Sequence, residues 1–482
     1  MKARSFTLRR AKSCVLAAAL AFATAACKPV TSEPGFDAVA GMVGAATGRD
    51  AVRVRTPDEA EAARARMAAQ LRRPLSADSA VQIALLGNRG LQAAYNELGL
   101  AEATALEASL PPNPTFAVAR LSGPVEIEIE RRIVGNILAL ATLPARAEVA
   151  RDRLRQAQLR AAEETLRLAA EARRNFYRAV TAREQVRLLE EANAAAETAS
   201  QLARRLGESG AMNKLDQARD QVFYAELAAQ LASARQRAAS ERERLIRSLG
   251  LWGGDLGFRL PERLPALPAR PRTWPAIEQD AVAHRFDLQL ARMDVAALAK
   301  SYDLTAATRF ISLLELAGAG KNTQEKQTGE QIRDRGFELE FQIPIFDLGE
   351  ARVRKAEEIY MQAVNRLAEK AVNVRSQARD AYRSYRSTYD IARHYEREVL
   401  PLRKIISEET LLRYNAMLID VFALLAEARQ RIAANIAAIE ARRDFWLAHV
   451  DLATAVVGGG AGAGEGNMAQ LAAPPAGEAA GH

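Results

Sequence analysis

The chain has 482 residues, of which 49% are hydrophobic and 26% charged, values that allow two or three domains of ordinary globular composition. Its formal net charge of +8 would suit a nucleic-acid-binding protein, but five basic residues lie within the first 26 residues, where there is no acid. Removal of that stretch leaves 8 − 5 = +3, so charge gives no argument for nucleic acid and we expect no nucleic-acid partner.

The first 26 residues have the pattern of a lipoprotein signal peptide. Their basic stretch, Lys2–Lys12, precedes an apolar run, Val15–Ala23. The following Thr24–Cys27 resembles a lipoprotein signal-peptidase box, in which Cys27 becomes the acylated first residue of the mature protein. An ordinary cleavage site beside a bystander cysteine is the alternative. Lys28 stands in place of the aspartate that favours retention in the inner membrane, so we expect sorting to the outer membrane.

Motifs for catalysis or metal binding are missing from the sequence. Cys14 would leave with the signal peptide, and the four histidines are not at metal-ligand spacing with a cysteine or with one another. No Ser-His-Asp, HExxH or phosphate-loop pattern occurs, so we expect neither an enzyme nor a cofactor. Met212 and Met417 could bind a soft metal as a pair, but core packing is the interpretation that we favour, and no metal site is predicted.

Helix and strand signals alternate in the first half of the chain. Residues 27–70 are rich in Ala, Gly and charge, and we expect a poorly ordered tether that leads into a helix. A helix is then predicted from an N-cap at Ser76 to about Leu110, where prolines end it. Apolar and acidic residues alternate strictly over Val125–Glu130, which predicts a strand, and Phe116–Leu121 is its weaker partner.

A very long helix is predicted next, from about Pro144 to Leu206. Its apolar residues follow a coiled-coil period, and at ~1.5 Å per residue its length is roughly 90 Å, more than a compact domain holds. Gly207–Gly210 breaks the helix. A second helix is expected over Lys214–Leu249, before a stretch rich in proline and glycine.

The second half of the chain repeats the first. Ala84–Ala94 resembles Ala281–Ala291 at an offset of 197 residues, and each copy begins a helix that leads into a strand pair. In the second copy we expect strands at Phe310–Leu316 and Phe337–Ile343, joined by a polar loop over Gly320–Arg335.

A long helix follows the second strand pair and ends near Arg413. A break near Asn415 leads to a last helix over about Ile419–Val457. The predicted organisation is a signal peptide, a tether, two repeats of helix, two strands, long helix, turn and helix, and a disordered tail, over 1–26, 27–70, 71–270, 271–457 and 458–482 respectively.

The strands indicate an oligomer. Each half supplies two strands, and four strands cannot close a barrel, since the smallest closed barrels have about eight. No stretch after the signal peptide has about 18 consecutive apolar residues, so a membrane span of this chain has to be a closed β-barrel. The predicted fold class is mainly α with a β-barrel part, in which several chains share one barrel and the long helices continue as a tube.

Five segments resemble the TolC-like outer-membrane efflux protein family, the outer membrane factors. The first three are similar to the opening helix, the corner from helix to strand and the corner after the fourth strand, and the last two to the tips of the helical hairpins: Leu75–Val81, Leu110–Pro114, Ile343–Gly349, Arg205–Ala218 and Arg413–Ala428. Their order, spacing and duplication carry the resemblance, which covers most of the chain.

The resemblance implies a homotrimer of the lipoprotein type, lipid-anchored in the outer membrane. Four strands from each protomer would form a twelve-stranded barrel, and the helices a tapered periplasmic tunnel. The implied function is an exit duct of a tripartite efflux or export system. An inner-membrane pump would expel substrate through a periplasmic adaptor of the membrane fusion type and then through the duct. Metal ions, drugs and polypeptides all stay open as cargo.

Alternation along the strands assigns two faces. Ile127, Ile129, Leu339 and Phe341 would face lipid, and five acids would line the barrel lumen: Glu126, Glu128, Glu130, Glu338 and Glu340. The functional interpretation is an acidic mouth that favours cations. A merely solvated inner face is the alternative, which we prefer.

The hairpin tips supply the remaining site residues. By resemblance, Asp216, Tyr414 and Asp420 would lie at the tapered periplasmic gate, and three copies of Asp420 would form a ring that attracts cations. Helix capping is the alternative for both aspartates and is compatible with gating. The second tip is shorter than is usual in the family. The expected adaptor-docking surface consists of Leu206, Gly207, Gly210, Ala211, Leu215 and Met417, with a plain helix turn as the alternative.

The main alternative function is a non-channel structural lipoprotein with long coiled coils in the cell envelope. The strand pairs and the two-fold repeat argue against it, because a tether needs neither.

Overall fold

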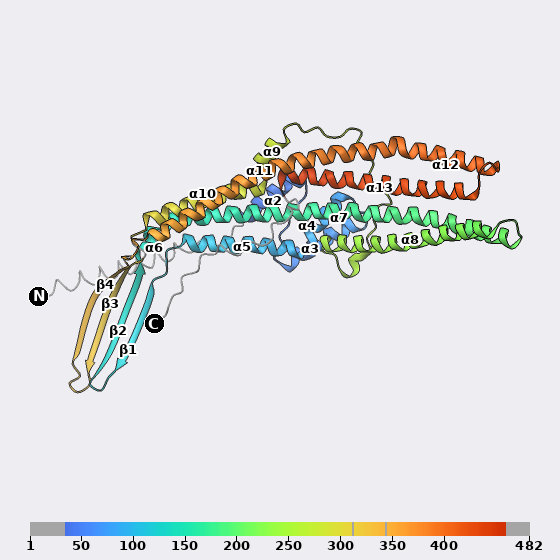
Figure 1. The fold of residues 1–482 in the computed structure, drawn as a ribbon. Coiled ribbons are helices and arrows are strands. Elements are labelled where there is room, and N and C mark those ends of the chain that lie inside the picture. Colours follow the sequence, from blue (N-terminus) through green and yellow to red (C-terminus); the bar gives the residue numbers. More distant parts are fainter. Residues whose placement is uncertain (1–33, 311–312, 343–344, 459–482) are drawn as a thin grey trace.

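The computed structural model describes residues 34–310, 313–342 and 345–458. The predicted signal peptide, Cys27 and the predicted tail from residue 459 onward lie outside the described residues. The fold is mainly helical with one four-stranded antiparallel sheet, as the sequence predicts. Figure 1 shows the sheet at one end of the long helices and two helical hairpin tips at the opposite end.

The order of elements follows the predicted repeat. The segment before the repeats contains α2 (Pro34–Thr47) and α3 (Pro57–Leu71). The first repeat contains α4 (Ala77–Gly87), α5 (Arg89–Ser109), β1 (Thr115–Ser122), β2 (Glu126–Asn136), α6 (Ile137–Ala141), α7 (Leu143–Glu208), α8 (Lys214–Leu249) and η1 (Gly253–Gly257). The second contains α9 (Ile277–His284), α10 (Phe286–Ala307), β3 (Leu313–Glu325), β4 (Gln331–Gln342), α11 (Glu350–His394), η2 (Tyr395–Val399), α12 (Leu400–Asn415) and α13 (Val421–Val457).

The helix predicted from Ser76 to Leu110 is two helices in the structure. Ser76 caps α4 as predicted, but the chain leaves the helical conformation at Asn88. The Asn88 side chain accepts a hydrogen bond from the Leu91 N–H at 3.1 Å and donates one to the Ser248 carbonyl at 3.2 Å. Asparagine favours such local bonds to the backbone over an unbroken helix. The second repeat breaks at Arg285, and 285 − 88 = 197 is the offset of the sequence repeat.

The central helix of the molecule is α7, whose 66 residues make it about 100 Å long. Small buried residues along it, such as Ala162 and Ala172, let neighbouring helices approach closely. Phe176 and Val180 pack with the end of α8 in one core cluster. A second cluster around Phe445 joins α11 to α13. The core is therefore a series of clusters along a rod.

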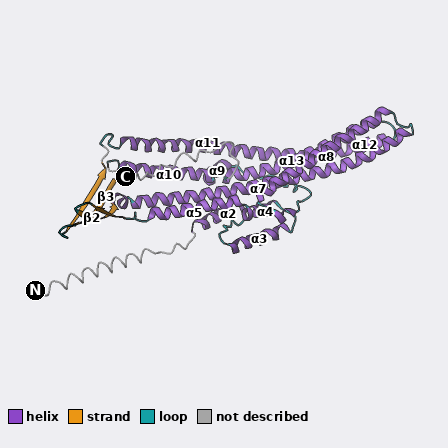
Figure 2. Ribbon diagram, turned by 90° about the horizontal axis from the view of Figure 1, so that it is seen from below, coloured by secondary structure: helices purple, strands orange, loops and turns teal. Residues whose placement is uncertain are grey.

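The predicted tether is wrong for residues 34–71, which fold onto the rod. Val39 and Val43 of α2 are fully buried, and Phe36 makes an edge-to-face contact with Tyr95 at 4.9 Å between ring centroids. Thr56 and Glu59 form a capping box at the start of α3. Phe36, Val39 and Val43 follow a helical spacing in a segment whose many alanines and glycines obscure it. Figure 2 shows α2, α3 and α4 along one flank of α7.

The predicted polar loop over 320–335 is also wrong, because most of it is strand. β3 runs to Glu325 and β4 begins at Gln331. β2 continues to Asn136 and pairs with β3 along its whole length, so the backbone groups of these polar residues are hydrogen-bonded. The strand order is β1-β2-β3-β4, and β1 and β4 are the edges.

The helix predicted to end near Arg413 is α11, η2 and α12 in continuity. η2 is one turn of π-helix just before Pro401, which has no N–H to donate to the carbonyl of Arg397. This missing hydrogen bond accounts for the widened turn.

Candidate functional site

The structure divides the predicted site residues between the two ends of the molecule. The five glutamates of the predicted lumen lie on the sheet, and the predicted gate and docking residues lie at the hairpin tips (Figure 1).

The strand register sorts the side chains of the sheet onto two faces. Residues paired across strands, and alternate residues along one strand, share a face. All five predicted glutamates fall on one face, and Ile127, Ile129, Leu339 and Phe341 all fall on the other. The first face, which we call the acidic face, has eight acids and two bases: Glu126, Glu128, Glu130, Glu315, Glu325, Asp334, Glu338, Glu340, Arg132 and Lys321.

Ion pairs on the acidic face connect the two halves of the chain. Lys321 Nζ lies 2.7 Å from Glu128 Oε1, which joins β3 to β2. Arg132 on β2 reaches Glu338 at 3.3 Å and Glu340 at 3.9 Å on β4. Two bases cannot neutralise eight acids, so the face keeps a formal charge of 2 − 8 = −6. Such a face attracts cations, and it attracts them more strongly when it is shielded from bulk water.

The first hairpin tip is a capped turn between α7 and α8. Asn213 accepts a hydrogen bond from the Asp216 N–H at 2.9 Å, and its amide donates to Asp216 Oδ2 at 2.7 Å. Gly210 takes a left-handed conformation with φ of +79°. Leu206 and Leu215 are exposed. Asp216 thus sits in the first turn of α8 and interacts with its N-cap residue.

The second tip is a turn between α12 and α13, as long as the first. Asp420 is the N-cap of α13, and its Oδ1 accepts from the Ala423 N–H at 2.9 Å. Met417 is 93% exposed and has φ of +57°, a conformation that glycine adopts far more easily. Tyr414 is half-buried, and its carbonyl accepts from the Met417 N–H at 2.9 Å. The capping interpretation thus describes the geometry of Asp420 in the single chain.

The two tips are in contact through arginines of α8 and α13. Arg219 lies 3.5 Å from Asp216 Oδ1, and its guanidinium is 4.9 Å from the centroid of the Phe422 ring. Further along, Arg429 pairs with Glu226 at 3.0 Å. The structure therefore brings Asp216 and the start of α13 into one neighbourhood.

Two buried acids near the tips were missed by the sequence analysis. Asp220 is 3% exposed, and its Oδ2 has no hydrogen-bond partner among the described residues; burial raises the pKa of its carboxyl. Glu427 is 8% exposed and lies 3.3 Å from Arg403. The overlooked signal is an acid in an apolar stripe, since Asp220, Phe223 and Leu227 follow a helical spacing.

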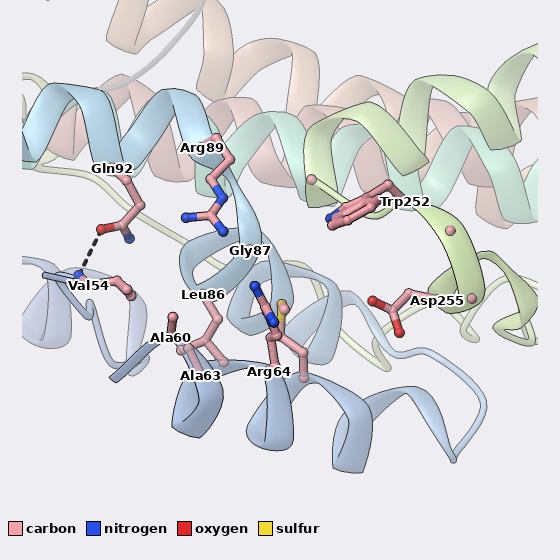
Figure 3. Close-up of a pocket in the computed structure, with 14 residues that line it drawn as sticks. Val54, Ala60, Ala63, Arg64, Leu86, Gly87, Arg89, Gln92, Trp252 and Asp255 are labelled. Carbon is pink, nitrogen blue, oxygen red and sulfur yellow. Dashed lines mark hydrogen bonds between the residues drawn. The ribbon is translucent and has the colours of Figure 1, made fainter. Parts of the chain in front are cut away.

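A cleft of about 240 Å³ lies on the flank of the molecule, far from both ends. Its walls come from α3, the junction of α4 and α5, and the residues after α8, with Arg64 and Asp255 projecting into it (Figure 3). The Gln92 side chain accepts a hydrogen bond from the Val54 N–H at 2.9 Å at its edge. The cleft forms where the folded N-terminal segment covers the helix break, and its lining shows no catalytic grouping.

The described residues contain neither a metal-ligand cluster nor a helix suited to cross a membrane. No three or more His, Cys, Asp or Glu side chains there are arranged to hold a metal ion. None of the described helices is both long and apolar enough to cross a membrane.

Comparison with known proteins places the fold among outer-membrane channels. No family model and no curated protein matches the sequence. The structure resembles CusC, described by its transmembrane channel formation, with a TM-score of 0.66 and 16% identity over 81% of this chain and 92% of that one. It resembles the Campylobacter jejuni CmeC outer membrane channel with a TM-score of 0.66 and 15% identity over 80% and 86%.

The outer-membrane channel OprN gives a TM-score of 0.66 at 18% identity over 87% of this chain and 95% of that chain. The chain thus has the fold of TolC-like outer-membrane channels, and the resemblance predicted from the sequence is confirmed at the level of the fold.

Proposed function

We propose that this chain is the outer-membrane exit duct of a tripartite efflux or export system, as a member of the TolC-like outer membrane factors. It would conduct passively the substrate that an inner-membrane pump expels through a periplasmic adaptor. The observation that carries the proposal is the sheet. One face, which we call the apolar face, holds Ile127, Ile129, Leu339 and Phe341 and no acid, and the other is the acidic face; β1 and β4 each have one edge without a strand partner among the described residues.

Such a sheet needs partners, because unpaired edge strands and an exposed apolar face are both costly in water. Three copies joined edge to edge, β4 to β1, would close a twelve-stranded barrel with the acidic face toward the lumen and the apolar face toward lipid. The hollow helical tunnel and the homotrimer belong to this proposal. A structural tether would have no use for a sheet of two unlike faces.

The remaining roles are part of the same proposal. Residues 1–26 would be a signal peptide and Cys27 the acylated residue, which anchors the chain to the outer membrane. Asp216, Tyr414 and Asp420 would form the periplasmic gate. The adaptor would meet the tip residues Leu206, Gly207, Gly210, Ala211, Leu215 and Met417.

The test is single-channel recording from full-length protein extracted from outer membranes and reconstituted in planar bilayers. We expect stepwise ion conductance with a preference for cations. Flotation on a density gradient serves as the control for membrane insertion. Inserted protein that shows no conductance, even after the tip acids are substituted, would overturn the duct in favour of the structural lipoprotein.

A further inference from the structure

The apolar face of the sheet has a second property that the proposed function does not use. Its four charged residues are all arginines, and no Asp or Glu lies on it: Arg120, Arg131, Arg333 and Arg335. All four are exposed. None of them forms an ion pair within the described part of the chain, and the only side-chain bond is from Arg333 to Gln331 at 3.3 Å. Every acid of the strands lies on the opposite face.

The register places these arginines in two adjacent rows. One row runs Val118, Arg131, Gly320, Arg335 across the four strands, and the next runs Arg120, Ile129, Asn322, Arg333. Gly320 separates Arg131 from Arg335, so these two backbones are about 10 Å apart with no side chain between them on this face. Two guanidinium groups at that spacing can reach one anion from both sides.

The arginine rows border a purely apolar band. The row on the helix side of Arg131 contains Phe116, Ile133, Gly318 and Phe337, and Leu316 with Leu339 comes next. On the other side of the arginines lie Ser122, Gln324 and Gln331 with the apolar Ile127, and then the two strand turns. The turns are joined by the bond from Lys326 Nζ to the Gly123 carbonyl at 2.7 Å. Along β1 and β4 the order is apolar, cationic, polar, turn, with about 7 Å between rows. On this face β2 has Ile129 and Ile127 between Arg131 and the turn, and β3 carries no cation.

We propose that these four arginines form a cationic girdle that binds the phosphate groups of the phosphorylated glycolipid in the outer leaflet of the membrane. The proposal rests on the proposed barrel, in which this face contacts lipid and the turns face the outside. The arginine rows then lie at the level of the headgroups, and the acyl chains cover the apolar band. Arginine suits this task because its planar guanidinium binds phosphate oxygens in pairs and its stem packs on apolar neighbours.

The test uses the full-length, membrane-extracted protein in phosphatidylcholine nanodiscs. Binding of lipid A is compared with binding of dephosphorylated lipid A, which differs only in the phosphates. We expect the parent protein to prefer lipid A and the preference to weaken at high salt. The quadruple variant with Arg120→Gln, Arg131→Gln, Arg333→Gln and Arg335→Gln should lose affinity for lipid A by about tenfold or more, because each basic group near an anionic surface contributes.

A charge-matched control removes four exposed arginines from the helical flank: Arg64→Gln, Arg66→Gln, Arg72→Gln and Arg73→Gln. This variant should bind lipid A like the parent. Equal binding of the two lipids by the parent would overturn the girdle, whatever the variants do, and so would an unchanged affinity in the quadruple sheet variant.

Conductance of the parent in phosphatidylcholine bilayers separates the two proposals. A parent that conducts but does not distinguish the lipids refutes the girdle alone. Membrane-inserted protein that shows no conductance, even after the tip acids are substituted, refutes the duct, and the girdle with it.

Discussion

At the scale of single residues, the two tip aspartates have a structural role that does not depend on any gate. Asp420 caps α13 and Asp216 bonds the N-cap residue of α8. Both also stand near the helix N-termini, where a negative charge is favoured by the helix dipole. Capping and gating can be separated experimentally, because asparagine caps a helix as well as aspartate does but has no charge.

We expect Asp420→Asn to reduce the cation preference of the channel and to leave the tip as stable as before. Asp420→Ala should have the same effect on ion preference and should also raise hydrogen exchange around 421–424, since losing a cap costs about 1 kcal/mol. The measurements are single-channel selectivity and amide exchange. Glu409→Gln, which removes an exposed acid from α12, is the control for charge alone. Unchanged ion selectivity in both Asp420 variants would show that this residue caps the helix and takes no part in the gate.

Met417 offers a second prediction at this scale. A left-handed conformation costs an ordinary residue about 1–2 kcal/mol, and a glycine avoids this cost. Glycine's greater freedom in the unfolded chain offsets part of that gain. We therefore expect Met417→Gly to slow amide exchange at the second tip by a few fold. Ala416→Gly next to it, where φ is −82°, should slow nothing. Faster exchange in Met417→Gly would show that the exposed methionine makes stabilising contacts in the assembled protein.

At the scale of elements, the sequence predicts the long helices, the breaks at both tips and all four strands, although β2, β3 and β4 extend beyond their predicted bounds. These elements have a strong local period or a proline or glycine at their ends. The extensions of β3 and β4 were missed because the polar residues of β3 are held by pairing with distant β2, and those of β4 by pairing with β3, and no local pattern reports that. Asn88 and Arg285 end helices through contacts and conformation that an apolar period does not encode.

The candidate site could be predicted only as far as alternation and resemblance reach. Alternation places the five predicted glutamates on one face, as the register has them, but it did not predict Glu315, Glu325 or Asp334 on the same face. Asp220 and Glu427 were missed because an acid within an apolar stripe is expected to be exposed, and only its neighbours in space show that it is buried.

The N-terminal segment leads to a prediction at the element scale. Val39 is fully buried against the rod, so Val39→Asp places an unpaired charge in the core and should undock α2. Trypsin should then cut after Arg53, whose side chain is 7% exposed in the docked state, at least tenfold faster, because cleavage follows the population of the open form. Ala38→Asp on the exposed side of the same helix is the control. Equal rates of trypsin cleavage in the two variants would instead support a poorly ordered tether.

At the scale of the whole molecule, the repeat explains how one chain makes a four-stranded sheet with two unlike faces. Each half gives one strand pair and one hairpin of long helices, and the halves meet where β2 pairs with β3. The helix breaks 197 residues apart show that the halves share their bends as well as their order. β1 and β4 are then the only edge strands of the described sheet, and each has a neighbouring strand on one side only.

Edge pairing gives the last prediction. With a cysteine at Ala117 on β1 and another on β4, oxidation should join neighbouring chains, provided the two Cα atoms lie within about 7 Å. The Cβ atoms must also point to the same side of the sheet, which only β4 positions on the acidic face can satisfy. A scan of Asp334, Gly336 and Glu338 should therefore contain the reactive partner, and Phe337 on the opposite face should stay unlinked. A closed ring of three yields a covalent trimer and nothing larger on a denaturing gel. Single-cysteine variants control for the natural cysteines. Open ladders of increasing size, or linkage at Phe337 equal to that of its neighbours, would contradict a closed barrel with a defined inner face.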